Sequence, residues 1–245
     1  MNPKSNTLFH FTKSRETLKH ILRSGFWPQY SLEDVAWFGS DKHEYVAYPM
    51  VCFCDIPLSR IGDHVKFYGE FGIGLIRPWA EAHGLNPVFY VAGKNVLSAF
   101  RELNDHSNKH VEESQRGAAR VPMRYLLAHT KPAHGKMMVV GQEEEKSFFQ
   151  ESEWRYVPKH NDIKAFLVRS EFNNETQRNY ANTQTKKHCL IKFEPKDIRY
   201  IFVKSDADIP DVVKCIQTEL DLSSEDDRWI LISRVVSLES LSADL

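Results

Sequence analysis

Apolar residues recur with two different periods along the chain, and the changes of period predict short strands between brief helices. The first strand is expected over 7–12. A helix follows it, with Ser14 placed to cap its N-terminus and Gly25 placed to end it. The same patterns predict further strands over 49–57, 69–76, 85–91, 135–140, 148–157, 189–193, 198–203 and 229–236. They predict further helices over 58–68, 78–83 and 209–220.

Three segments lack a clear strand or helix period. The ranges 26–48 and 141–146 are expected to be loops, and 161–187 is polar and without a pattern. A fourth segment, 94–134, is polar and helical and is expected to be an excursion that gates a cleft or touches a partner. The alternation of short strands and helices predicts one α+β domain over 1–245, with a mixed, split sheet beside a cleft containing His10, Tyr68 and Glu153.

An unusual feature is a pair of acids inside the aromatic run 148–157. In a strand, Glu151, Glu153 and Arg155 share one face, while Trp154 and Tyr156 point the other way. Two close carboxylates repel, and burial is expected to raise the pKa of at least one of them. Such a pair suits a site that holds a hydroxyl group or stabilises a developing cation. The alternative is an edge strand with a solvated face of Glu and Arg.

Composition narrows the class of protein. Hydrophobic residues make up 42% of the 245 residues, which is ordinary for a globular chain, and no apolar run approaches the roughly 18 residues of a membrane span. The first residues lack the apolar core of a signal peptide, so a cytoplasmic location is expected. Four cysteines are too few and badly spaced for a disulfide framework. They are expected to be reduced and buried, with zinc binding as the alternative.

The formal net charge of −1 argues against a wholly basic surface for bulk nucleic acid, although it permits a local basic groove. On the first strand, His10 lies between Phe9 and Phe11, which is typical of a core histidine. The alternative is that His10 and the nearby Thr12 donate hydrogen bonds to a ribose hydroxyl.

Five stretches carry a resemblance to a known family, namely 8–25, 50–59, 68–75, 84–88 and 151–155. Together they span most of the first 160 residues, and on them the chain resembles the abortive phage-infection proteins of the AbiGi type. The arrangement is also similar, remotely, to the ADP-ribosyltransferase fold, which has a first-strand His, a middle-region Tyr and a late Glu preceded by a second acid. The resemblance therefore implies a single ADP-ribosyltransferase-like domain.

The resemblance to transferases implies a set of site residues for NAD as co-substrate, without a metal. Cleavage of the bond between nicotinamide and ribose creates an oxocarbenium-like centre, which Glu153 would stabilise while Glu151 orients the acceptor. His10 and Thr12 would hold the ribose on the adenosine side. The role implied for Tyr68 is stacking on nicotinamide, with packing at a helix end as the alternative. Arg77 would contact a phosphate, or else be a solvated charge.

The function implied first is a toxin of an anti-phage toxin–antitoxin system, an NAD-dependent ADP-ribosyltransferase that modifies single-stranded RNA such as mRNA, or DNA. Stacking on rings such as Tyr30 and Phe71, with interleaved basic residues, would capture the nucleotide. The alternatives are transfer to a protein, hydrolysis of NAD, and a catalytically silent antitoxin or interaction protein. A toxin would require a cognate antitoxin, alone or with a chaperone, docking on 94–134 or 161–187.

Overall fold

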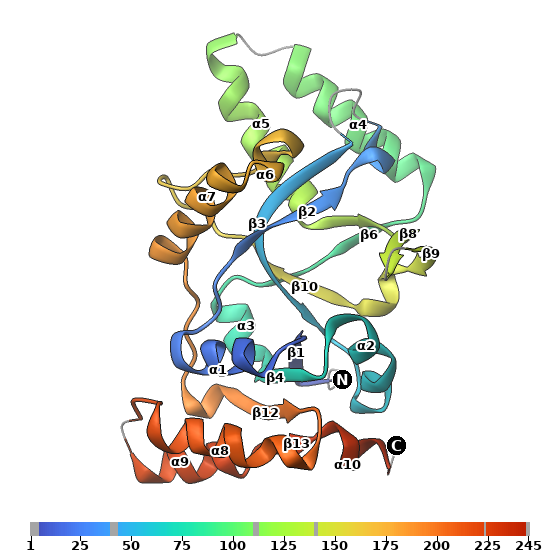
Figure 1. Cartoon of the computed structure of the whole chain (residues 1–245). Helices are drawn as coiled ribbons and strands as arrows, with labels where there is room; N and C mark the ends of the chain where they lie inside the picture. Colours follow the sequence, from blue (N-terminus) through green and yellow to red (C-terminus); the bar gives the residue numbers. More distant parts are fainter. Residues whose placement is uncertain (1–4, 40–43, 110–112, 140–141, 223, 244–245) are drawn as a thin grey trace.

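The computed structural model of the chain describes residues 5–39, 44–109, 113–139, 142–222 and 224–243 (Figure 1). A mixed sheet of nine strands runs through it in the order β13-β12-β4-β1-β3-β10-β5, with β2 and β11 also paired to β3. The strands of this sheet are β1 (Thr7–Thr12), β2 (Gln29–Asp34), β3 (Tyr45–Cys54), β4 (Phe71–Ile76), β5 (Asn86–Pro87), β10 (Glu153–Tyr156), β11 (Leu167–Val168), β12 (Ile198–Val203) and β13 (Val235–Ser237). Among the described strands of this sheet, β12 and β13 pair in parallel and the other pairs are antiparallel, so the predicted α+β class with a mixed sheet is confirmed.

The sheet divides between β1 and β3. Strand β1 pairs with β4 along its whole length, but it meets β3 at a single register pair, Phe9 with Cys54. The first half of β3 pairs instead with β2, and its second half pairs with β10 on the other edge. The part containing β4 and β12 therefore lies below the division in Figure 1, and the part containing β2 and β10 lies above it.

Helices cover both faces of the lower part of the sheet. The helices are α1 (Arg15–Ser24), α2 (Ile61–Tyr68), α3 (Arg77–Ala82), α4 (Lys94–Lys109), α5 (Glu113–Ala128), α6 (Arg169–Asn173), α7 (Glu175–His188), α8 (Ile209–Thr218), α9 (Glu225–Ile232) and α10 (Leu238–Ser242). Leu8, Ile73 and Ile201 pack on one face against apolar residues of α1, α3 and α8. Phe9 and Phe202 pack on the opposite face against α2 and α10. Each fully buried side chain of this kind contributes roughly 1.5–3 kcal/mol, which fixes the layers.

Two small sheets complete the fold. Strands β6 (Phe89–Val91) and β7 (Thr130–Pro132) pair in parallel, and helices α4 and α5 form the connection between them. Strands β8 (His134–Val139) and β9 (Gln142–Ser147) form an antiparallel hairpin. The α4–α5 hairpin projects at the end of the molecule opposite α8 and α9 (Figure 1). The predicted helical excursion is thus present, except that its last residues form β7.

Several other expectations are wrong. The expected loop 26–48 contains β2 and the start of β3, and the expected loop 141–146 lies largely in β9, because pairing with β3 and β8 outweighs the polar character of these segments. The patternless range 161–187 holds α6 and α7. The apolar run expected as a strand over 229–232 belongs to helix α9, and 189–193 makes only one bridge, between Ile191 and Phe26. No helix in the described ranges is both long and apolar enough to cross a membrane.

Candidate functional site

The two acids approach each other by a route that the strand pattern did not predict. Glu151 ends a short 3-10 helix, η3 (Phe148–Glu151), and is not part of a strand. Ser152 then adopts a left-handed conformation with φ of 45°, and β10 begins at Glu153. Glu153 and Arg155 share a buried face of β10, as predicted, because they are two residues apart. The predicted single strand over 148–157 is therefore wrong, because the left-handed residue breaks it.

Arg155 is the centre of the cluster and its side chain is completely buried. Its Nε donates to Glu153 Oε1 at 2.7 Å, and its Nη2 donates to Glu33 Oε2 at 2.8 Å. Its Nη1 donates to the backbone carbonyl of Ala128, at the end of α5, at 2.7 Å. One guanidinium thus joins β10, β2 and α5, using the planar arrangement of donors that suits arginine to such positions.

Two lysines and a tyrosine approach the acids from other elements. Lys131 of β7 places its Nζ 2.8 Å from Glu153 Oε2 and 3.6 Å from Glu151 Oε2. Lys146 of β9 lies 2.6 Å from Glu151 Oε1, to which the hydroxyl of Tyr68, at the end of α2, also donates a hydrogen bond. We call Glu33, Tyr68, Lys131, Lys146, Glu151, Glu153 and Arg155 the charge network.

The pKa shifts within the charge network hold Glu153, Lys131 and Arg155 in their charged forms. Burial pushes the pKa of Glu153 upward, but Arg155 and Lys131 outweigh that effect and hold it well below its usual range. Burial alone would lower the pKa of Lys131, but the negative charges of Glu153 and Glu33 outweigh burial and raise this pKa above its usual value. The rise in pKa expected for at least one of the two carboxyls does not occur at Glu153, because the attraction of Arg155 and Lys131 exceeds the effect of burial.

The charge network is balanced. Three carboxylates face three cations, and each oxygen of Glu151 and Glu153 has a cation of this chain within 3.6 Å. Both acids are only 6% exposed. Burial of Tyr68, followed by the nearby Glu151, raises the pKa of the phenol, so Tyr68 remains a proton donor to that carboxylate. This arrangement suits a network that holds six elements together, because its charges are neutralised from within.

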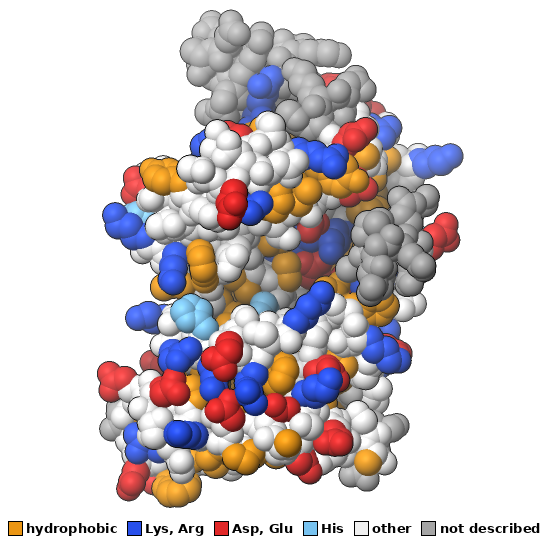
Figure 2. All heavy atoms as spheres, viewed as in Figure 1, with side chains coloured by type: hydrophobic (Ala, Val, Ile, Leu, Met, Phe, Trp, Pro, Cys, Tyr) orange, Lys and Arg blue, Asp and Glu red, His pale blue; other side chains and the backbone are white. Residues whose placement is uncertain are grey.

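Figure 2 shows this face of the molecule hollowed between its upper and lower halves, with acidic and basic side chains deep in the hollow. The charge network spans the same division, since Tyr68 belongs to α2 in the lower half and Glu153 to β10 in the upper half. The network therefore ties together the two parts into which the sheet divides.

His10 and Thr12 are not brought to the acids. Phe9, Cys54 and Glu153 lie in one register row and so share a face, which places the side chain of His10 on the opposite face of the sheet. His10 Nδ1 lies 2.8 Å from the carbonyl oxygen of Cys52, at the point where β1 and β3 separate. Its ring packs against Phe26 and Phe53, and burial lowers its pKa. The structure thus favours the interpretation of His10 as a core histidine, here one that bridges the split, over a ribose contact.

Arg77 also lies on the far side from the charge network. Its Nη2 is 2.7 Å from Asp55 Oδ2 and donates to the carbonyl of Ser5 at 2.8 Å, while its guanidinium carbon lies 4.9 Å from the centre of the Trp154 ring. It is therefore an internal ion pair rather than the solvated charge weighed from sequence. Of the predicted site residues, the structure brings together Tyr68, Glu151 and Glu153.

Two of the rings predicted to capture a nucleotide, Tyr30 and Phe71, are buried and not available for stacking. Tyr30 is 4% exposed and donates to the carbonyl of Lys164, and Phe71 is 9% exposed in the main core. Sequence reasoning also missed three members of the charge network, Glu33, Lys131 and Lys146. They belong to three different strands, β2, β7 and β9, and the one local signal was the spacing of Glu153 and Arg155.

Comparison with known proteins gives two matches. The family model described as "Putative abortive phage resistance protein AbiGi, antitoxin" matches residues 24–204. Among curated proteins, the chain is similar to "Abortive phage resistance protein AbiGi" of Lactococcus lactis subsp. cremoris. The identity is 28% over 210 residues, covering 74% of this chain and 82% of that protein. No solved structure matches the chain significantly.

Proposed function

The chain belongs to the AbiGi family of abortive phage resistance proteins, and from this premise we propose that it is the antitoxin of a toxin–antitoxin pair. It would act as an interaction protein that binds a toxin partner and holds it inactive until infection. The single observation that carries this proposal is the match of residues 24–204 to a family described as an antitoxin.

The family match corrects the function implied by the transferase resemblance. A toxin that transfers ADP-ribose to nucleic acid is contradicted by the antitoxin description, which agrees with the alternative of an interaction protein. The expected cognate partner is accordingly a toxin and not an antitoxin. NAD as a co-substrate stays an untested prediction. The finer fold prediction, an ADP-ribosyltransferase-like sheet, is kept as a proposal about the scaffold alone, supported by the division between β1 and β3.

The charge network supports an interaction role. Carboxylates that serve catalysis need oxygens that can reach a substrate or its reacting proton. In this protein Arg155 and Lys131 occupy the oxygens of Glu153, while Lys146 and Tyr68 bond Glu151. A substrate would have to displace these partners, each of which is held by a different strand or helix. The network is thus suited to holding the surrounding strands and helices in place rather than to catalysis.

The α4–α5 hairpin supplies the surface that we propose for the toxin. Among the described residues, nine large hydrophobic side chains are exposed, and five of these lie on the hairpin or on the strand leading into it. Those five are Phe89, Val96, Leu103, Val121 and Leu126. Apolar residues gathered on an exposed, projecting element commonly mark a protein interface. This agrees with the expectation that 94–134 touches a partner.

The test is expression in a bacterial host of this chain and of the protein encoded beside it, which is the candidate toxin. We expect the candidate toxin alone to arrest growth, this chain alone to leave growth unchanged, and the two together to restore growth and purify as a complex. Arrest of growth by this chain alone, at a level where it is soluble, would contradict the proposal.

Variants locate the interface. Leu103→Glu and Val121→Glu, tested separately, place a charge on the proposed surface and are expected to weaken the complex about tenfold or more, because a desolvated charge opposes binding. The matched control is Trp229→Glu on α9, whose side chain is 59% exposed at the other end of the molecule. The hairpin assignment is wrong if the three variants restore growth equally well.

A further inference from the structure

A second cluster of polar side chains lies away from the charge network and has no part in the proposed function. His160 and Asp162 belong to the segment that follows β10, and His188 is the last residue of α7. The rings of the two histidines stack with their centres 4.6 Å apart. One ligand atom from each of the three residues lies within 4.8 Å of the others. Two segments far apart in sequence therefore present three donors to one point.

The chemistry of this set suits a divalent transition-metal ion. Imidazole nitrogens and a carboxylate oxygen are ligands of zinc and of its neighbours in the first transition series. Bonds of roughly 2.0–2.2 Å place tetrahedral ligand atoms roughly 3.4 Å apart, so the separations, now within 4.8 Å, would have to contract by up to about 1.4 Å. His160 and Asp162 are exposed and His188 is half-buried, so rotation of their side chains meets little resistance.

The contacts in the cluster show what a bound cation would replace. The backbone N–H of Asp162 donates to His160 Nδ1 at 3.2 Å, which requires the unprotonated form of that nitrogen. The carboxylate oxygen Oδ2 of the same aspartate lies 3.7 Å from that nitrogen, beyond hydrogen-bonding distance. Because the N–H occupies the one lone pair of Nδ1, a metal ion would bind His160 through Nε2, or through Nδ1 once this hydrogen bond opens. Asp162 and His188 would supply the other two ligands.

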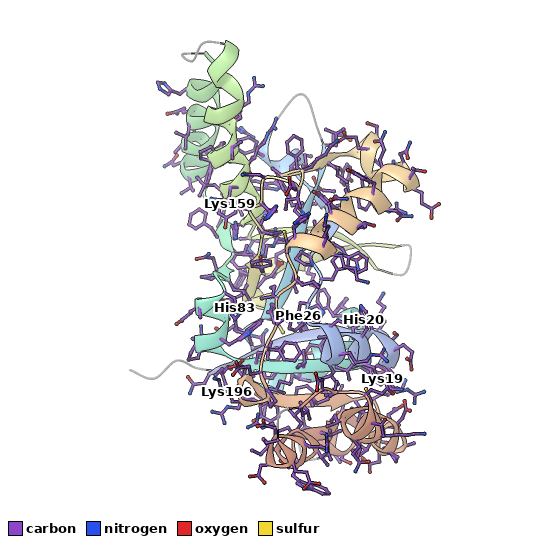
Figure 3. The ribbon with its side chains drawn as sticks, turned by 90° about the vertical axis from the view of Figure 1, so that its left-hand side faces the viewer. Lys19, His20, Phe26, His83, Lys159 and Lys196 are labelled. Atoms are coloured by element: carbon purple, nitrogen blue, oxygen red, sulfur yellow. The ribbon has the colours of Figure 1, made fainter. Side chains whose placement is uncertain are left out.

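We propose that His160, Asp162 and His188 form a binding site for one divalent transition-metal ion of the zinc class. The bound ion ties the segment after β10 to the end of α7. Lys159, beside His160, lies against α5 with its Nζ 3.6 Å from the centre of the Tyr125 ring (Figure 3). The ion therefore stabilises the place where the α4–α5 hairpin, β10 and α7 meet, and it does so whether or not the protein is an antitoxin.

The experiment is calorimetric titration of the metal-free, full-length protein with ZnCl₂, together with the visible absorption of its Co²⁺ form. We expect one ion per chain and a Co²⁺ spectrum typical of nitrogen and oxygen ligands. His160→Ala, His188→Ala and Asp162→Asn should each weaken binding by at least roughly tenfold. Zinc should raise the thermal midpoint of the native protein but not that of His188→Ala.

The matched control is His83→Ala, which removes another exposed histidine at the end of α3, well separated from Lys159 in Figure 3. This variant should bind zinc as the native protein does. Circular dichroism would establish that each variant is folded. The proposal is overturned if the native protein binds no zinc, or if the three cluster variants bind it as tightly as His83→Ala.

Discussion

Replacing Arg155 by Met tests whether the charge network carries the stability of this fold. The guanidinium is completely buried and contacts Glu153, Glu33 and the carbonyl of Ala128. Met retains most of the volume of the side chain but supplies none of these donors. The network then has three carboxylates and two cations, so that one buried negative charge is left without compensation.

The expected loss follows from the geometry. Breaking a buried ion pair by removing one partner costs roughly 3–5 kcal/mol. Lys131 remains 2.8 Å from Glu153, and the side chain of Glu33 is 19% exposed and reaches water. The loss should therefore lie at the lower limit, at about 3 kcal/mol. For a chain of this size that corresponds to a fall of roughly 6–12 °C in the thermal midpoint, measured by calorimetry or circular dichroism.

Two further variants make the result specific. Glu153→Gln added to Arg155→Met leaves two carboxylates and two cations, and it should recover part of the loss, with a coupling of roughly 0.5–3 kcal/mol. Arg199→Met makes the same substitution at an exposed residue of β12 and should change stability by less than about 0.5 kcal/mol. A midpoint for Arg155→Met equal to that of Arg199→Met would refute the reasoning.

The pH dependence of stability gives an independent check, because its direction follows from the lowered pKa of Glu153. The pKa of Glu153 in the folded protein lies below its ordinary value of 4.5, because Arg155 and Lys131 outweigh the effect of burial. Its ionic contacts therefore stabilise the fold above pH 4.5, and this stabilisation is lost as the pH falls below that value. The difference in midpoint between the native protein and Arg155→Met should be full at pH 7 and shrink below about pH 4. A difference that grows with acidity would contradict the assignment.

Three other substitutions have expected outcomes in the same thermal assay. Tyr68→Phe removes the donor to Glu151 but leaves Lys146, so we expect a loss of about 1.5 kcal/mol, and an unchanged midpoint would show that the hydroxyl contributes nothing. Gly69→Ala should destabilise by roughly 1–3 kcal/mol, because φ is 115° and a Cβ would lie 2.2 Å from the carbonyl oxygen of Thr12. Gly62→Ala, in helix α2 with open space around the new methyl group, should instead stabilise by up to about 1 kcal/mol; a loss there would mean that helix propensity does not govern α2.

Local signals predicted the elements whose shape is decided by nearby residues. Ser14 accepts a hydrogen bond from the Thr17 N–H, and Gly25, with φ of 84°, ends α1, as the sequence indicated. The apolar stripe of α8 and the strand β12 also lie where their periods placed them. Glu153 and Arg155 share a face because alternation along a strand is a local property.

At α9 two local signals compete: an apolar run that favours a strand, and an N-terminal cap with acids that favours a helix. The run 229–232 is continuously apolar, which favours a strand, yet Ser224 caps a helix there and three acids occupy its first turn. The cap and the acids at the N-terminus of the helix stabilise α9, and the helix leaves Trp229 and Ile230 exposed.

Only the tertiary structure decided the pairing of strands and the content of the site. The polar segments of β2 and β9 become strands because β3 and β8 supply their hydrogen-bonding partners, and no periodicity within the segments specifies that. Lys131 and Lys146 reach the acids from separate strands, and the left-handed turn at Ser152 brings Glu151 to them. Alternation along one strand placed Arg155 beside Glu153, whereas Glu33, Lys131 and Lys146 join the network through strand pairings that no local pattern specifies. The sequence by itself could therefore propose the acids and one partner, but not the other two cations and the third carboxylate of the network.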